Sequence, residues 1–88
     1  MISVKFYSHK KCKENFPYYL VDSLAIVTGE LEEVDKITDY LADDFPDFFG
    51  IGGSTKFMIK DFEHFTKLLY KIYEFYGEDE PIVNISFS

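Results

Sequence analysis

Two stretches with a helical hydrophobic period, separated by a short glycine- and phenylalanine-rich stretch, most constrain the fold of this chain. In residues 30–45, apolar side chains recur at spacings of three and four residues: Leu31, Val34, Ile37, Leu41 and Phe45. Residues 62–76 repeat such a stripe, and Pro46 ends the first segment. Asp61 is placed to cap the second helix and Gly77 to end it. The sequence therefore predicts two helices.

Short segments that alternate apolar and polar side chains, or that are β-branched, surround these helices. Each predicts a strand: 2–8, 56–60 and 82–87. In the first strand, the side chains expected to face the core come at every second position: Ile2, Val4 and Phe6. Residues 46–55, rich in Gly and Phe, predict a loop between the first helix and the next strand.

Residues 16–28 fit two interpretations. A stripe of Leu20, Leu24 and Val27 is compatible with a helix, but the β-branched residues before Gly29 favour a strand at 23–28. The element order is then β-β-α-β-α-β, or β-α-α-β-α-β if 16–28 is helical. Right-handed crossovers would place both helices on one face of the sheet. We expect an α+β two-layer sandwich, with a mixed sheet of about four strands and two helices on one face.

Length and composition indicate one domain, 1–88, with a substantial core. Of the 88 residues 47% are apolar, and ten Phe and seven Tyr bury more area than smaller side chains would. No run of about 18 apolar residues predicts a membrane span, and the chain does not start with the long apolar stretch of a signal peptide. The single cysteine, Cys12, cannot form an internal disulfide. We therefore expect a cytoplasmic protein.

The net charge of −7 is unevenly distributed along the chain. Residues 1–13 carry +4, residues 14–54 carry −9 and residues 55–88 carry −2. An acidic middle segment disfavours nucleic acids and anionic membranes as partners and favours a protein with a basic surface. The chain also contains no Arg, the side chain that most often reads phosphate and guanine.

The acids of the first helix are the most informative candidate site. Seven acids lie between Glu30 and Asp44, about one per 3 Å of helix axis, close to the roughly 3.4 Å per charge of one DNA strand. Those predicted to lie opposite the apolar stripe are Glu32, Asp35, Asp39 and Asp43. Further acids and aromatic residues that suit a binding surface follow these four acids in the sequence: Asp44, Asp47, Phe48 and Phe49. The alternative is a solvated face that only keeps the protein soluble.

The sequence offers weak signals for catalysis or for a cofactor. His9 and Cys12 stand in a basic loop without a third group to orient them. The glycine loop 50–56 follows a predicted helix and leads into a strand, the reverse of a phosphate-binding loop. No pair of acids is singled out for general acid–base chemistry. We expect no enzyme activity, no metal and no cofactor.

The resulting hypothesis is a small acidic binding protein. Its sharper form is an inhibitor, such as a phage or mobile element would encode, that imitates DNA and occupies a basic nucleic-acid-binding site on a target protein. The alternative is an adaptor, immunity-type or homodimerising module that uses the aromatic flank of the second helix: Tyr70, Tyr73 and Phe75.

Overall fold

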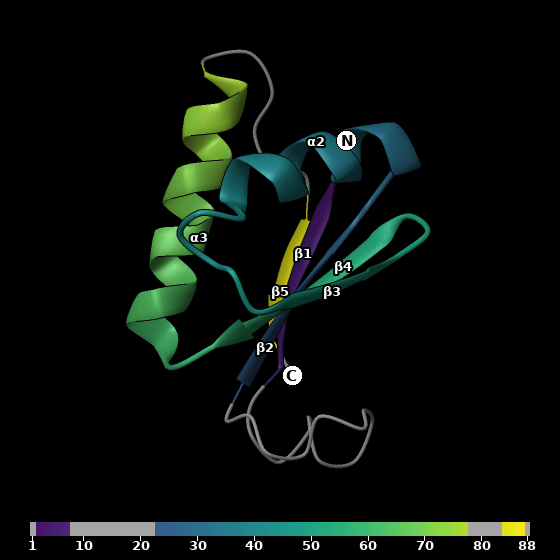
Figure 1. Ribbon diagram of the computed structural model, residues 1–88. Coiled ribbons are helices and arrows are strands. Elements are labelled where there is room, and N and C mark those ends of the chain that lie inside the picture. Colours follow the sequence, from purple (N-terminus) through teal and green to yellow (C-terminus); the bar gives the residue numbers. More distant parts are fainter. Residues whose placement is uncertain (1, 8–22, 78–83, 88) are drawn as a thin grey trace.

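The computed structural model describes residues 2–7, 23–77 and 84–87. These residues form a two-layer α+β arrangement, with five strands in one mixed sheet and two helices packed on it (Figure 1). In chain order the elements are β1 (Ser3–Tyr7), β2 (Ser23–Thr28), α2 (Leu31–Leu41), β3 (Phe48–Ile51), β4 (Ser54–Ile59), α3 (Phe62–Tyr76) and β5 (Asn84–Phe87). The predicted fold class is confirmed.

The strand order β3-β4-β2-β1-β5 explains why both helices lie on the same side of the sheet. β2 is antiparallel to both β1 and β4, β3 is antiparallel to β4, and β5 is parallel to β1. Each helix therefore connects two parallel strands: α2 joins β2 to β3, and α3 joins β4 to β5. The starting strands β2 and β4 are antiparallel, and the two connections run toward opposite edges of the sheet. Right-handed crossovers of that kind place their helices on one face, as Figure 1 shows.

One apolar cluster fills the space between the sheet and the helices. Alternate residues of β1, β2 and β4 face it, as the period of two requires. Its fully or almost fully buried members include Ile2, Val4, Ala25, Val27, Ile37, Leu41, Phe57, Ile59, Phe65, Leu68 and Ile72. The predicted inward residues of the first strand are confirmed, with Phe6 packed at the margin of the cluster.

The second helix begins and ends where its sequence predicts. The Asp61 carboxylate accepts a hydrogen bond from the backbone N–H of His64 at 2.9 Å. At the other end, Gly77 adopts φ = 69°, and its N–H donates to the carbonyl of Tyr73 at 2.9 Å. No helix in the described residues is long and apolar enough to cross a membrane.

The first helix is shorter than predicted, and one stripe residue is not in the core. α2 spans Leu31–Leu41, and a turn replaces its last predicted residues. Val34, Ile37 and Leu41 are buried, but Leu31 is 56% exposed because it lies on the flank of the helix beside the hairpin turn. Phe45 is buried beyond the helix end.

The predicted loop 46–55 is wrong for residues 48–51, which form strand β3, and for residues 54–55, which belong to β4. Phe48 pairs with Phe57, and a two-residue turn, Gly52-Gly53, connects β3 to β4. Gly52 has φ = 57°, which hairpin turns of this length require at the first central position. β4 consequently begins at Ser54, two residues before the predicted strand.

The remaining predictions fall partly outside the described residues. The strand interpretation of 23–28 is confirmed by β2. Of the predicted strand 82–87, β5 confirms 84–87. Residues 16–22, and the candidate pair His9 and Cys12, lie outside the described residues.

Candidate functional site

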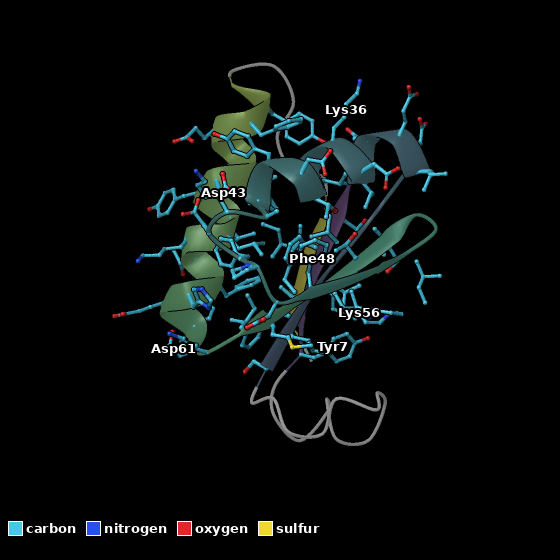
Figure 2. All side chains as sticks on the ribbon, viewed as in Figure 1. Tyr7, Lys36, Asp43, Phe48, Lys56 and Asp61 are labelled. Atoms are coloured by element: carbon cyan, nitrogen blue, oxygen red, sulfur yellow. The ribbon has the colours of Figure 1, made fainter. Side chains whose placement is uncertain are left out.

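Three of the four acids predicted to face away from the core lie on the outer side of α2, and the fourth, Asp43, lies in the turn that follows the helix. We call the four together the acidic ridge: Glu32, Asp35, Asp39 and Asp43, all exposed. At about 100° per residue the four span an arc of roughly 80°, centred opposite the buried side of the helix. Side chains on this side of α2 project away from the sheet, as Lys36 does in Figure 2. The predicted orientation of these acids is confirmed by their exposure.

The four acids of the ridge make no hydrogen bond or ion pair with any other part of the described chain. The described ion pairs belong instead to Lys71 on α3. Exposed like charges three or four residues apart on a helix repel one another by a few tenths of a kcal/mol. The ridge therefore contributes no stabilising contact to the described fold, and its charges are directed entirely to solvent or to a partner.

Two other acids of the same segment are used inside the molecule. Glu33 accepts a hydrogen bond from the hydroxyl of Tyr76 on α3, and this bond holds the pKa of Glu33 below its usual value. Asp44 lies 3.1 Å from the Lys71 ammonium, which raises the pKa of that lysine. Both acids hold α2 and its C-terminal turn against α3, so neither belongs to the ridge. Asp44 is still exposed, and its predicted part in partner binding stays a prediction.

The Lys71 ammonium is the centre of a polar contact between the two helices. It lies 3.6 Å from Glu74 and 4.9 Å from the centre of the Tyr40 ring. The Tyr40 hydroxyl donates to the Glu74 carboxylate, which lowers the pKa of Glu74 and raises that of Tyr40. Because this contact is exposed, we expect it to set the angle between the helices more than to stabilise them.

This internal use of acids changes the charge density of the site. From Glu32 to Asp43 the ridge covers about 16.5 Å, or about 5.5 Å per charge step. One strand of duplex DNA carries a charge every 3.4 Å or so along its axis. The close match expected from the sequence included Glu33 and Asp44, which pair with residues of α3. The ridge is therefore a strongly acidic surface, but a sparser one than a phosphate strand.

The structure places Phe48 and Phe49 on opposite faces of the sheet. Asp47, Phe48 and Phe49 are all exposed, at or beside the edge strand β3. Phe48 pairs with Phe57 and so lies on the helix side of the sheet, where the two rings are 5.7 Å apart. Phe49 pairs with Lys56 on the opposite face. The predicted phenylalanine loop is therefore not one surface, because a strand directs neighbouring side chains to opposite faces.

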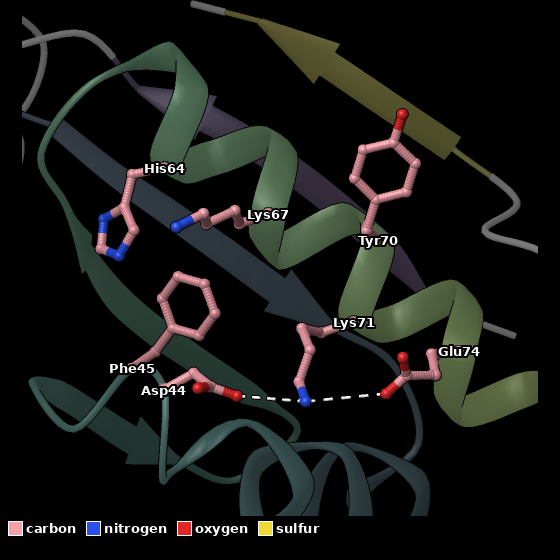
Figure 3. Close-up of a pocket in the computed structure, with 7 residues that line it drawn as sticks. All are labelled: Asp44, Phe45, His64, Lys67, Tyr70, Lys71 and Glu74. Carbon is pink, nitrogen blue, oxygen red and sulfur yellow. Dashed lines mark ion pairs between the residues drawn. The ribbon is translucent and has the colours of Figure 1, made fainter.

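A groove lies beside α3. It has a volume of about 380 Å³ and is lined by Asp44, Phe45, His64, Lys67, Tyr70, Lys71 and Glu74 (Figure 3). The rings of Phe45 and His64 stack with their centres 4.7 Å apart. This contact depends on the turn after α2, which brings Phe45 to a residue 19 positions later in the sequence, so the helical period alone does not indicate it.

The surroundings of His64 favour the neutral form of its imidazole. Its Nδ1 accepts the backbone N–H of Lys60 at 3.1 Å, so the neutral ring carries its proton on Nε2. Partial burial lowers the pKa of His64, and the nearby charge of Lys60 lowers it further. No acid in the groove accepts from this ring in the described contacts, and the arrangement lacks a nucleophile–base–orienter series.

The other sequence signals for chemistry do not converge on a site within the described chain. The glycine loop is a hairpin turn between two strands, so no helix N-terminus follows it to hold a phosphate. No group of three His, Cys, Asp or Glu side chains in the described residues is arranged to hold a metal ion.

The aromatic flank of α3 is partly used inside the fold. Phe75 is half-buried and its ring lies 5.3 Å from that of Tyr40, so it joins the two helices. Tyr70 is 72% exposed and Tyr73 is 40% exposed. The excess of aromatic residues on this helix is therefore explained in part by packing on α2, and two tyrosines remain at the surface.

In comparisons with models of protein families, with curated proteins and with solved structures, the chain matches none of them.

Proposed function

We propose that this protein is a binding module that docks the acidic ridge of α2 on a basic surface of another protein. The observation that carries the proposal is the division of the acids in this segment. Glu33 and Asp44 pair with α3, whereas the four ridge acids are exposed and unpaired in the described chain. Such a surface attracts a basic partner over long distances and speeds association.

A nucleic-acid-binding site on the target is the narrower form of this proposal. A site built to hold phosphates presents lysines and arginines to which a rigid row of carboxylates is complementary. The ridge is carried on a helix that is fixed by a buried face and by contacts with α3. A charged surface on a fixed backbone binds with little loss of backbone freedom, which favours a partner of defined shape.

Matched charge reversals test the proposal. Asp39→Lys and Glu63→Lys change the net charge equally, and both residues are exposed on a helix. Asp39 lies on the ridge, whereas Glu63 lies in the first turn of α3. In pull-downs from the native host's lysate at about 50 mM salt, we expect the parent and Glu63→Lys to retain the same proteins and Asp39→Lys to lose most of them. Equal retention by both variants would contradict a role for the ridge.

A second arm separates the narrower form from the general one. Duplex DNA added to the captured complex competes only if the target uses its nucleic-acid-binding site for the ridge. Capture should also weaken by orders of magnitude between about 50 and 200 mM salt if several phosphate-binding groups are engaged. If DNA does not displace the partner but Asp39→Lys still abolishes capture, the partner binds the ridge through a basic surface that is not its nucleic-acid-binding site. That result would support the general proposal and contradict the narrower one.

A further inference from the structure

Strand β3 lies at one end of the sheet, with β4 as its one neighbour in the described chain. Its four residues are all exposed, and three of them are large and apolar: Phe48 at 39%, Phe49 at 41% and Ile51 at 61%. An exposed apolar edge strand without a lysine or proline is a ready template for pairing with another strand. The edge of β3 is therefore a candidate site for pairing with another chain.

The ladder with β4 determines which backbone groups point outward. The N–H of Met58 donates to the carbonyl of Asp47 at 2.9 Å. Because hydrogen-bonded pairs alternate along an antiparallel ladder, Phe49 and Ile51 also direct their backbone groups toward β4. Phe48 and Gly50 therefore direct their N–H and C=O groups to the free edge.

We propose that the edge of β3 pairs with β3 of a second copy of this chain, antiparallel and in one register. In that register Phe48 pairs with Gly50 of the other copy and Gly50 with its Phe48, giving four hydrogen bonds between the copies. The two-fold axis then passes between the two Phe49 side chains. A two-fold interface has this property: if one residue of the first copy contacts a second residue of the other copy, the reverse contact is also made.

The neighbouring registers are excluded by the ends of the strand. Pairing Phe48 with itself would require a hydrogen bond from Pro46, which has no N–H. Pairing Gly50 with itself would require Gly52 to extend the strand, but Gly52 has φ = 57° in the hairpin turn. One symmetric register uses both residues that point outward.

Side chains on both faces of the seam fit this register. On the helix side, each Phe48 ring lies across from a glycine, where no Cβ obstructs it. On the opposite face the two Phe49 rings meet as a cross-strand aromatic pair. Above the seam, the stripe of α2 that continues from Thr38 toward this edge is uncharged: Leu31, Thr38 and Ala42. The acidic ridge lies outside the seam, and the net charge of −7 on each copy opposes association without blocking the seam itself.

A seam of four residues with a few apolar neighbours is smaller than a typical stable interface of about 800 Å² per partner. We therefore expect a concentration-dependent dimer with a dissociation constant of about 1–100 µM. The acidic ridge remains exposed in the dimer, so this inference does not depend on the partner proposed for the ridge.

Disulfide trapping tests the register, in a Cys12→Ser background. Phe49→Cys places the two thiols in a non-hydrogen-bonded pair, with Cα atoms about 4.5 Å apart, within the range of a disulfide. Ile51→Cys is the matched control on the same strand and face, because its counterpart lies about 13 Å away, four residues along the ladder. We expect mild oxidation to cross-link Phe49→Cys almost completely and Ile51→Cys hardly at all.

Sedimentation of the parent from about 5 µM to 1 mM tests the association itself. We expect dimers that Phe49→Lys abolishes and Tyr70→Lys, an exposed aromatic on α3, retains, with circular dichroism confirming that both variants fold. Hydrogen exchange at Phe48 and Gly50 should slow as the parent dimerises. The proposal would be overturned if the parent were monomeric at every concentration, or if both cysteine variants cross-linked equally. It would also be overturned if a different protein protected these two amides while the chain stayed monomeric.

Discussion

The hydrogen bond between Thr38 on α2 and Thr55 on β4 predicts an unusual pattern of stabilities. The two hydroxyl oxygens lie 2.9 Å apart. Thr55 is 3% exposed, whereas Thr38 is half-buried and can reach water if its partner is removed. The Thr55 hydroxyl has no other described hydrogen bond. Loss of either hydroxyl therefore has different consequences for the one that remains.

The magnitudes follow from this difference in burial. Thr38→Val leaves a buried hydroxyl without a partner, which costs about 1–3 kcal/mol. Thr55→Val leaves a hydroxyl that water can satisfy, so we expect a loss of about 0–1 kcal/mol. Valine and threonine have similar shapes and similar helix propensities, so the double variant should lie within about 0.5 kcal/mol of the parent. The double variant is then more stable than Thr38→Val alone.

Urea unfolding of the four proteins measures these differences, with the slope m as a check that the unfolding transition is unchanged. For a domain of this size, each kcal/mol shifts the melting temperature by about 4–8 °C. The two single variants could instead lose equal amounts of the free energy of unfolding, with the losses adding up in the double variant. That result would show that the two hydroxyl groups are not coupled and would contradict this prediction.

Three further predictions concern the frame around the ridge and the groove. Gly53→Ala should cost about 2–3 kcal/mol in urea unfolding, because its Cβ would lie 2.4 Å from the carbonyl oxygen of Gly29; Gly50→Ala, whose Cβ meets ordinary contacts, is the control. Because burial lowers the pKa of His64, the unfolded chain binds the proton more readily, so the free energy of unfolding should fall as the pH drops below about 6.5; in His64→Phe that fall should be smaller, and an unchanged pH profile contradicts the assignment. Asp61→Ala should lower stability by about 1 kcal/mol through loss of the cap, and Asp61→Asn should restore most of it.

The elements with a strong period or a local cap were predictable from the sequence. The cap of Asp61, the end at Gly77 and the apolar stripe of α3 are local signals, and the structure confirms all three. β3 was missed because Phe48–Ile51 is only four residues long, contains a glycine and follows Pro46 closely. The strand exists because it pairs with β4, and the Gly52-Gly53 turn between two apolar segments was the one signal that indicated a hairpin.

The candidate site was predictable in part for the same reason. The helical period alone indicates which acids face outward, so the exposure of Glu32, Asp35 and Asp39 could be foreseen. The internal use of Glu33 could not, because its partner Tyr76 comes 43 residues later and on another helix. The sequence alone therefore overstates the charge density of the outward face, because acids that are close in sequence point in different directions in the fold.

The parallel pairing of β1 with β5 has a consequence for how the chain acquires its structure. Ser3 pairs with Asn84, so the edge of the first strand is completed by the last. Contacts between residues so distant in sequence slow folding. The chain loses the entropy of closing the loop between them before it gains the free energy of the strand pairing. During synthesis β1 and β2 can form early, but β1 keeps an open edge until β5 has left the ribosome. We expect a folding phase in milliseconds to seconds that depends on β5, and a nascent chain that is vulnerable to aggregation until its last strand arrives.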